Sequence, residues 1–249
     1  MSRADLLALL LLILILALWE FFCRILEVPP YILPPPSLII RTALVQAPLI
    51  FPHALVTALE ILCGIALALV VAVPLAMGMF ARPWLEKALS PFLVASQAIP
   101  VFALAPLLVI WLGTGRLSKI VVCALTLFFP VLVNTIVGIR SVEPGLRDLM
   151  RSLEATRWQT FTMLELPAAL PVFLSGLKIG LTLSVIGAVV GEFVAADRGL
   201  GFLVNLARGL FDTPLMFVAL VMLMAIALAF YLLMSLLERT LLAWQGDKG

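Results

Sequence analysis

The chain has 249 residues, of which 64% are hydrophobic and only 12% are charged, and its net charge is +2. Soluble domains have about 45–50% apolar and about 25% charged residues. The composition therefore excludes a water-soluble enzyme, a disordered regulator and a secreted disulfide scaffold, and the small net charge gives no indication of nucleic acid as a partner. We expect an all-α, polytopic membrane protein with one transmembrane domain, residues 1–249.

A membrane-spanning helix needs about 20 apolar residues, and the chain has room for six. No A-x-A cleavage site follows the first apolar segment, so it is predicted to be an uncleaved anchor helix. Prolines are dense over 28–52, which is predicted to be an extended external segment. The core of the domain is expected at about 54–242. The six predicted spans cover about 6–23, 54–80, 89–112, 119–139, 170–195 and 215–237.

Counting Lys and Arg on each side gives the orientation. With both termini in the cytoplasm, nine basic residues lie inside and six outside, while Lys178 falls within a span. The inside set is Arg3, Arg82, Lys87, Arg140, Arg147, Arg151, Arg157, Arg239 and Lys248. This orientation makes the long polar break at about 141–167 cytoplasmic.

The sequence lacks the residues from which a catalytic or metal-binding site could be built. Its three cysteines are odd in number and lie in or beside apolar runs, which favours buried, unpaired thiols. The single histidine, His53, is predicted to lie in a proline-rich loop, so no zinc or histidine-based catalytic site can be assembled. No G-x-x-x-x-G-K-[ST] sequence is present to cradle the phosphates of ATP. We therefore expect no enzyme activity, no resident cofactor and no metal.

Ionisable residues within a span should face a cavity or a partner. Glu60 either faces a cavity or a partner within the membrane or lies at the membrane interface. Lys178 either faces a cavity or a partner or extends its long side chain to the cytoplasmic surface. Glu192 either stabilises an external gate or packs near the interface. Small residues at every fourth position, among them Ser184, indicate helix packing seams more strongly than a substrate path. The polar residues considered for a pathway or gate are Glu60, Gln97, Asn134, Ser184 and Glu192.

The polar break between the fourth and fifth spans carries helix signals. Pro144 suits the first turn of a helix, and leucines at three- and four-residue spacing follow it on one face. Thr156 and Gln159 have the spacing of a capping box, which would start a second short helix, and Pro167 would end it. Trp158 and Phe161 on that helix are suited to docking into a groove of another protein.

The sequence from Arg151 through Glu165-Leu-Pro-Ala-Ala-Leu-Pro resembles the EAA loop of bacterial ABC importer permeases. Asp148, Leu149 and Met150 fall at the E-A-A positions, and Glu154 falls where that family has a glycine. The stretch beginning Ile99-Pro-Val-Phe resembles the nitrate/sulfonate/taurine-type permeases. The residues that the resemblance assigns to coupling are Asp148, Leu149, Met150, Arg151, Glu154, Ala155, Arg157, Trp158, Phe161, Leu164, Leu166 and Pro167.

This resemblance implies a type I importer fold and a permease of the bacterial inner membrane. Such a permease works as a pair, most simply a homodimer, and binds two cytoplasmic ATP-binding subunits through the loop. It receives solute from an extracytoplasmic binding protein. The solute would be of the sulfonate, nitrate or taurine type or a pyrimidine- or flavin-like heterocycle, and the acidic Glu60 tilts the expectation toward the heterocycle. The alternative is an ion-coupled secondary transporter, although the paired mid-membrane acids of internal repeats are not evident.

Overall fold

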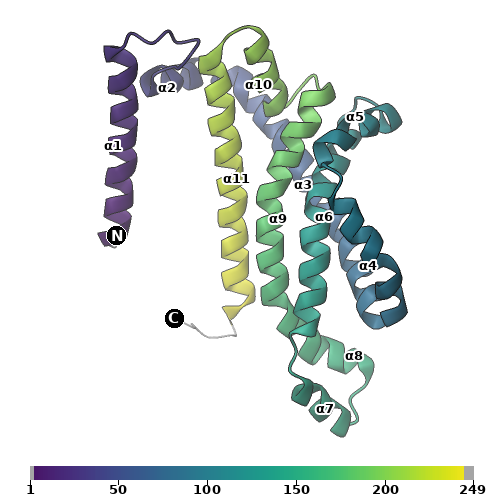
Figure 1. Cartoon of the computed structure of the whole chain (residues 1–249). Helices are drawn as coiled ribbons and strands as arrows, with labels where there is room; N and C mark the ends of the chain where they lie inside the picture. The colour runs from purple at the N-terminus through teal and green to yellow at the C-terminus, as the bar shows by residue number, and fades with distance from the viewer. Residues whose placement is uncertain (1–2, 244–249) are drawn as a thin grey trace. The chain divides into compact units, whose positions relative to one another are not determined.

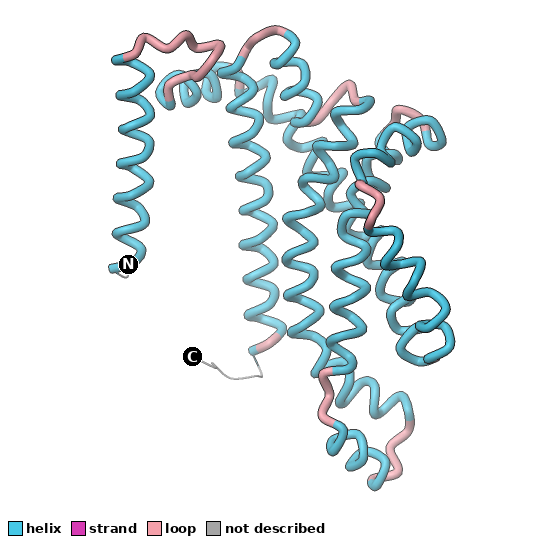
Figure 2. The backbone as a smooth tube through the Cα atoms, viewed as in Figure 1, coloured by secondary structure: helices cyan, strands magenta, loops and turns pink. Residues whose placement is uncertain are grey.

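The computed structural model describes residues 3–243, so Lys248, counted above among the inside basic residues, lies outside it. The described residues form helices and connecting loops without a strand (Figures 1 and 2). In chain order they are α1 (Arg3–Ile25), α2 (Pro36–Val45), α3 (Ala47–Ala81), α4 (Pro83–Gln97), α5 (Val101–Leu112), α6 (Arg116–Arg140), α7 (Pro144–Ser152), α8 (Arg157–Thr160), a π-helical turn η1 (Phe161–Glu165), α9 (Leu166–Ala195), α10 (Leu200–Gly209) and α11 (Thr213–Leu241).

Five helical segments of the described chain are long and apolar enough to cross a membrane, and a bent pair makes a sixth. The fold class expected from the sequence is therefore confirmed. The third predicted span, however, is not one straight helix. It consists of α4 and α5, which meet at 98°, because Pro100 removes a backbone donor and holds an extended conformation just before α5.

The chain divides into two compact units, each described here by itself. The first comprises Met1–Thr57 and Asp197–Met224, and the second comprises Ala58–Ala196 and Ala225–Gly249. The prediction that 28–52 is extended throughout is wrong, because this segment of the first unit contains α2 and the start of α3. Pro36 occupies the first turn of α2, where a missing N–H leaves no helical bond unmade. The Glu20 carboxylate accepts hydrogen bonds from the backbone N–H (3.0 Å) and hydroxyl (2.7 Å) of Ser37.

The connection between the fifth and sixth spans also contains a helix, α10, which was not predicted. Two side chains of α3 cap its N-terminus. The His53 Nδ1 accepts a 3.0 Å hydrogen bond from the N–H of Gly199, and the Thr57 Oγ1 accepts one of 2.8 Å from Leu200. His53 thus lies within α3 and not in a loop, and its ring serves a structural bond.

The core of the second unit lies between α3, α6 and α9. Helices α6 and α9 run side by side (Figure 1) and make the most extensive helix contact among the described residues. Small residues permit close packing on both sides of α6. A Cβ atom at Gly180 of α9 would lie 2.0 Å from Cδ1 of Leu127, and one at Gly64 of α3 would lie 2.4 Å from the Cβ of Cys123. Ala68, Ala72 and Ala76, on the same face of α3, are at most 2% exposed. The predicted seam of small residues is therefore confirmed as a packing surface.

Candidate functional site

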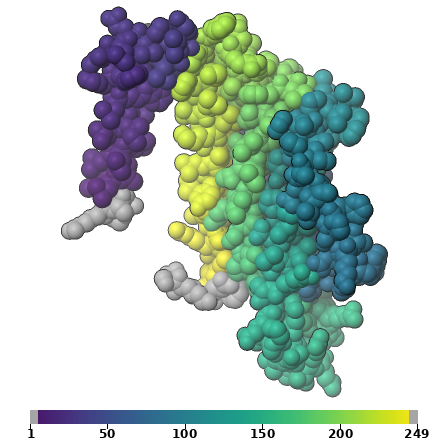
Figure 3. Space-filling model, in the orientation of Figure 1, coloured from purple at the N-terminus to yellow at the C-terminus, as the bar shows by residue number. Residues whose placement is uncertain are grey.

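The segment 144–167 projects beyond the ends of α6 and α9 within the second unit (Figure 3). It begins with α7, whose first helical residue is Pro144, as predicted. Leu146, Leu149 and Leu153 are 43–67% exposed, so the apolar face of α7 has no partner within the described chain. Asp148, predicted to hold the first E-A-A position, forms a 3.2 Å ion pair with Arg151, and both side chains are exposed.

Helix α7 ends in a left-handed turn at Glu154, whose φ is 55°. The N–H of Glu154 donates to the carbonyl of Arg151, and the N–H of Ala155 donates to that of Met150, each at 3.0 Å. These two bonds define a Schellman motif, in which glycine is the usual left-handed residue. Glu154 therefore adopts the left-handed conformation that glycine usually has in this motif.

The predicted capping box is confirmed. The Thr156 hydroxyl accepts a 3.3 Å hydrogen bond from the N–H of Gln159, and the Gln159 side chain accepts a 2.8 Å bond from the N–H of Thr156. Trp158 follows and is 71% exposed, with its ring centroid 5.9 Å from that of Phe161. The two aromatic side chains therefore lie together, as predicted for a docking helix.

Pro167 does not end this helix, contrary to the prediction. Residues of α8, η1 and α9 form one helical segment of 39 residues, Arg157–Ala195. Pro167 occupies the first turn of α9, immediately after the π-helical turn Phe161–Glu165. A π-helical turn changes the local hydrogen-bond spacing, and this accommodates the missing N–H. The aromatic pair, of which Trp158 is exposed and Phe161 half-buried, is thus directly continuous with the fifth predicted span.

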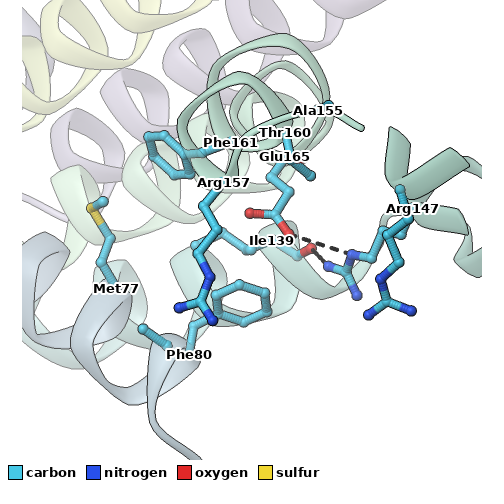
Figure 4. Close-up of a pocket in the computed structure, with 11 residues that line it drawn as sticks. Met77, Phe80, Ile139, Arg147, Ala155, Arg157, Thr160, Phe161 and Glu165 are labelled. Carbon is cyan, nitrogen blue, oxygen red and sulfur yellow. Dashed lines mark hydrogen bonds and ion pairs between the residues drawn. The ribbon is translucent and has the colours of Figure 1, made fainter. Parts of the chain in front are cut away.

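A cavity of about 570 Å³ lies between this segment and the ends of α3 and α6 (Figure 4). The Arg147 Nη2 atom donates a 2.8 Å hydrogen bond to the carbonyl of Ile139, and the Arg147 Nε lies 3.4 Å from the Glu165 carboxylate. The Arg147 guanidinium also lies 5.5 Å from the centroid of the Phe80 ring. Arg147 and Glu165 were not among the predicted site residues. The signal that was available is a series of three arginines, at 147, 151 and 157, in one short segment.

Other predicted coupling residues lie along the same segment. Leu164 is part of η1 and is half-buried, and Leu166 begins α9 and is 46% exposed. Ala155 and Arg157 line the cavity together with Phe161. The structure therefore gathers the predicted coupling residues in one projecting elbow.

Two of the acidic pathway candidates meet at the opposite end of the second unit. Glu60 is 2% exposed and Glu192 1%, and their side chains are hydrogen-bonded to each other. Lys119, 3% exposed, lies in the first turn of α6 and contributes a nearby positive charge. Its ammonium group donates to the carbonyls of Thr114 (2.6 Å) and Gly115 (3.2 Å). Glu60 is therefore buried within the protein.

The remaining candidates are not brought together. Gln97 lines a cavity of about 410 Å³ at the bend between α4 and α5. Asn134 donates a 2.8 Å hydrogen bond to the carbonyl of Pro130 and packs where a Cβ at Gly176 would lie. Ser184 is fully buried and donates to the carbonyl of Leu181. Within residues 3–243, no group of three or more His, Cys, Asp or Glu side chains could hold a metal ion.

Comparison with known proteins shows the family of the chain. Residues 61–242 match the family described as "Binding-protein-dependent transport system inner membrane component". Among curated proteins, the chain is 46% identical to the riboflavin transport system permease protein RibX of Chloroflexus aurantiacus, with 95% of this chain and 89% of that protein covered. It is 38% identical to the formylaminopyrimidine transport permease protein ThiX of Halalkalibacterium halodurans, with 94% and 93% covered.

A more distant relative is the taurine transport system permease protein TauC of Escherichia coli, 30% identical over 99% of this chain and 92% of that protein. Among solved structures, an inward-facing MetNI methionine ABC transporter matches with a TM-score of 0.68 at 18% identity, covering 79% of this chain and 97% of that chain. The family implies an ATPase and a substrate-binding protein as partners, and ATP hydrolysis belongs to the partner subunit. The chain belongs to the binding-protein-dependent transport system inner membrane components and is the multi-pass inner membrane permease subunit of an ABC importer, not an enzyme.

Proposed function

We propose that this permease is driven through the elbow formed by 144–167, which docks into a groove of the ATPase. The observation that carries the proposal is the exposure of Trp158 (71%) and of the leucine face of α7 on a segment whose backbone forms a Schellman motif and a capping box. Large apolar side chains on a projecting, structured segment are typical of a helix that docks into a groove. The elbow corresponds to the EAA loop.

The elbow acts as a lever because it is continuous with a span. Trp158 and Phe161 lie in the first turns of the 39-residue helical segment Arg157–Ala195. A displacement of these side chains by the ATPase therefore reaches α9 without crossing a flexible linker. Since α9 packs against α6 along its length, both helices move together between outward- and inward-facing states.

The assembly proposed is a homodimer of this chain with two ATP-binding subunits in the cytoplasm and one extracytoplasmic solute-binding protein. The one transmembrane domain, 1–249, carries both the solute pathway and the coupling elbow. The excess of basic residues on the side of the elbow supports a cytoplasmic location for the elbow and for both termini.

The solute proposed is a small organic heterocycle of the pyrimidine or flavin type. RibX and ThiX bear names that refer to riboflavin and formylaminopyrimidine, and both are more similar to this chain than TauC is. The cavity at the α4–α5 bend supports this choice, because Gln97 and Thr126 offer hydrogen bonds beside the rings of Phe128 and Phe129. No Lys or Arg lines this cavity, whereas a sulfonate or nitrate would favour one.

The buried pair Glu60 and Glu192 is proposed to close the outer end of the pathway. The two residues join α3 to α9, and Lys119 of α6 supplies a positive charge to the same place. Asn134 and Ser184 are proposed to support the pathway through the α6–α9 packing surface and not as solute contacts, since each is bonded within its own helix.

The decisive experiment is the double substitution Trp158→Ala and Phe161→Ala. We expect the ATPase to dissociate from the purified permease while insertion and thermal unfolding of the permease stay unchanged. Trp84→Ala is the matched control, because Trp84 is also exposed (63%) and lies just beyond the end of α3 that the elbow adjoins. Wild-type affinity for the ATPase in the double variant would contradict the docking assignment. In proteoliposomes, uptake driven by an ion gradient without ATP would contradict ATP-driven import.

A further inference from the structure

The cavity beside the elbow carries positive charge that the docking proposal, which rests on Trp158 and the leucine face of α7, does not account for. Trp158 is not among its lining residues, whereas three arginines are: Arg147 and Arg157, both labelled in Figure 4, and Arg151. Glu165 is the one acidic side chain in the lining. The cavity, about 570 Å³, is within the size range of small-ligand sites.

The positive charges of the arginines that line this cavity are only partly compensated by nearby carboxylates. Arg147 is held by Glu165 and by the carbonyl of Ile139, yet its Nε atom is buried without a hydrogen-bond partner of good geometry. Arg151 pairs with Asp148, but both side chains are more than 70% exposed, so the pairing is weak. Among the described residues, no carboxylate lies within 4.0 Å of the Arg157 guanidinium. The cavity therefore carries an excess of positive charge.

The position of the cavity indicates where its ligand comes from. Met77, Phe80 and Ile139 form an apolar part of the lining at the ends of α3 and α6, two helices long enough to cross the membrane. The ends of such helices lie at the level of lipid headgroups. A cavity lined by arginines and by apolar side chains suits a phosphate group that is attached to an apolar chain. Arg binds phosphate oxygens through paired hydrogen bonds.

We propose that this cavity binds a phosphate oxyanion, supplied by the headgroup of an anionic phospholipid or by free phosphate. Arg151 and Arg157 contact the oxyanion directly. Arg147, held by Glu165 and by the carbonyl of Ile139, adds its positive charge to the same lining. A bound anion would fasten the elbow to the ends of α3 and α6 and so set the position from which the ATPase moves it.

The test uses the full-length permease without its ATPase. Native mass spectrometry measures retention of phosphatidylglycerol and of phosphatidylcholine, and calorimetry measures binding of inorganic phosphate. We expect the double substitution Arg151→Gln and Arg157→Gln to weaken binding of the anion at least about tenfold. The matched control is Arg82→Gln with Lys87→Gln, which removes two exposed positive charges from the start of α4 that do not line the cavity.

A second variant changes binding in the opposite direction. Glu165→Gln removes the only negative charge of the lining, so it should tighten anion binding, a gain that misfolding cannot produce. Selective loss of phosphatidylglycerol in the double variant identifies a lipid as the source, and loss of phosphate binding alone identifies the free anion. The proposal would be overturned if the double variant bound phosphatidylglycerol and inorganic phosphate as tightly as the wild type does.

Discussion

The ammonium group of Lys178 on α9 forms an ion pair with the carboxylate of Glu238 on α11. The same ammonium group lies 5.3 Å from the centroid of the Tyr231 ring. Lys178 therefore has a fixed partner and does not reach for the aqueous surface by itself. A charge among apolar helices requires such a partner, and the ion pair joins the last helix of the chain to the helix that carries the elbow.

Removing one member of this pair should destabilise the permease. Both side chains are at most one quarter exposed, and Glu238→Ala would leave the Lys178 charge without its counter-ion, at a cost of roughly 3 kcal/mol. Thermal unfolding of the detergent-purified permease measures this loss. The exchange Lys178→Glu with Glu238→Lys should restore much of the stability. An unchanged unfolding midpoint in Glu238→Ala would show that the pair contributes nothing.

Local signals predicted the elbow well. Pro144, the leucine spacing and the Thr156–Gln159 capping box depend on residues within one or two turns of each other, and the structure contains all three. The continuation through Pro167 was missed because the rule that proline ends a helix does not anticipate a π-helical turn before it.

Partners distant in sequence could not be assigned from one chain. Lys178 and Glu238 are 60 residues apart, and Thr57 and Leu200 are 143 apart. Nothing local to either residue identifies the other. The cavity beside the elbow was missed for the same reason, since it needs Phe80 from α3 to meet Arg147 from α7. Composition and periodicity thus predicted the spans, whereas side-chain pairing depended on tertiary packing.

Glu154→Gly should stabilise the elbow. Glu154 holds a φ of 55°, which costs a non-glycine residue about 1 kcal/mol and costs glycine little. Hydrogen exchange of the amides at 153–156 should slow by several-fold in the variant. Glu154→Ala is the control, because it removes the carboxylate but keeps the strain, and its exchange should not slow. Equal slowing in both variants would trace the effect to the charge.

Gly138→Ala should weaken the contact between α6 and α9. A Cβ atom at this position would lie 2.7 Å from the carbonyl oxygen of Ala169 and 3.1 Å from its Cα. Backbone atoms cannot swing aside, so the helices must separate, at a cost of about 1–3 kcal/mol. Gly78→Ala is the matched control, since its nearest neighbour would be 3.6 Å away and alanine favours a helix by about 0.5–1 kcal/mol. Unfolding midpoints should therefore move in opposite directions, and a parallel shift would contradict this account.

Thr57→Val should destabilise the start of α10 in the first unit. The Thr57 hydroxyl is fully buried and accepts the N–H of Leu200 at 2.8 Å, and valine has the same shape without an acceptor. A buried N–H without a partner costs about 1–3 kcal/mol, so amides at 200–203 should exchange faster. Thr57→Ser keeps the acceptor and should retain most of the protection. If serine increased exchange as much as valine does, keeping the acceptor would not protect these amides, and the hydrogen bond would not be what holds the start of α10.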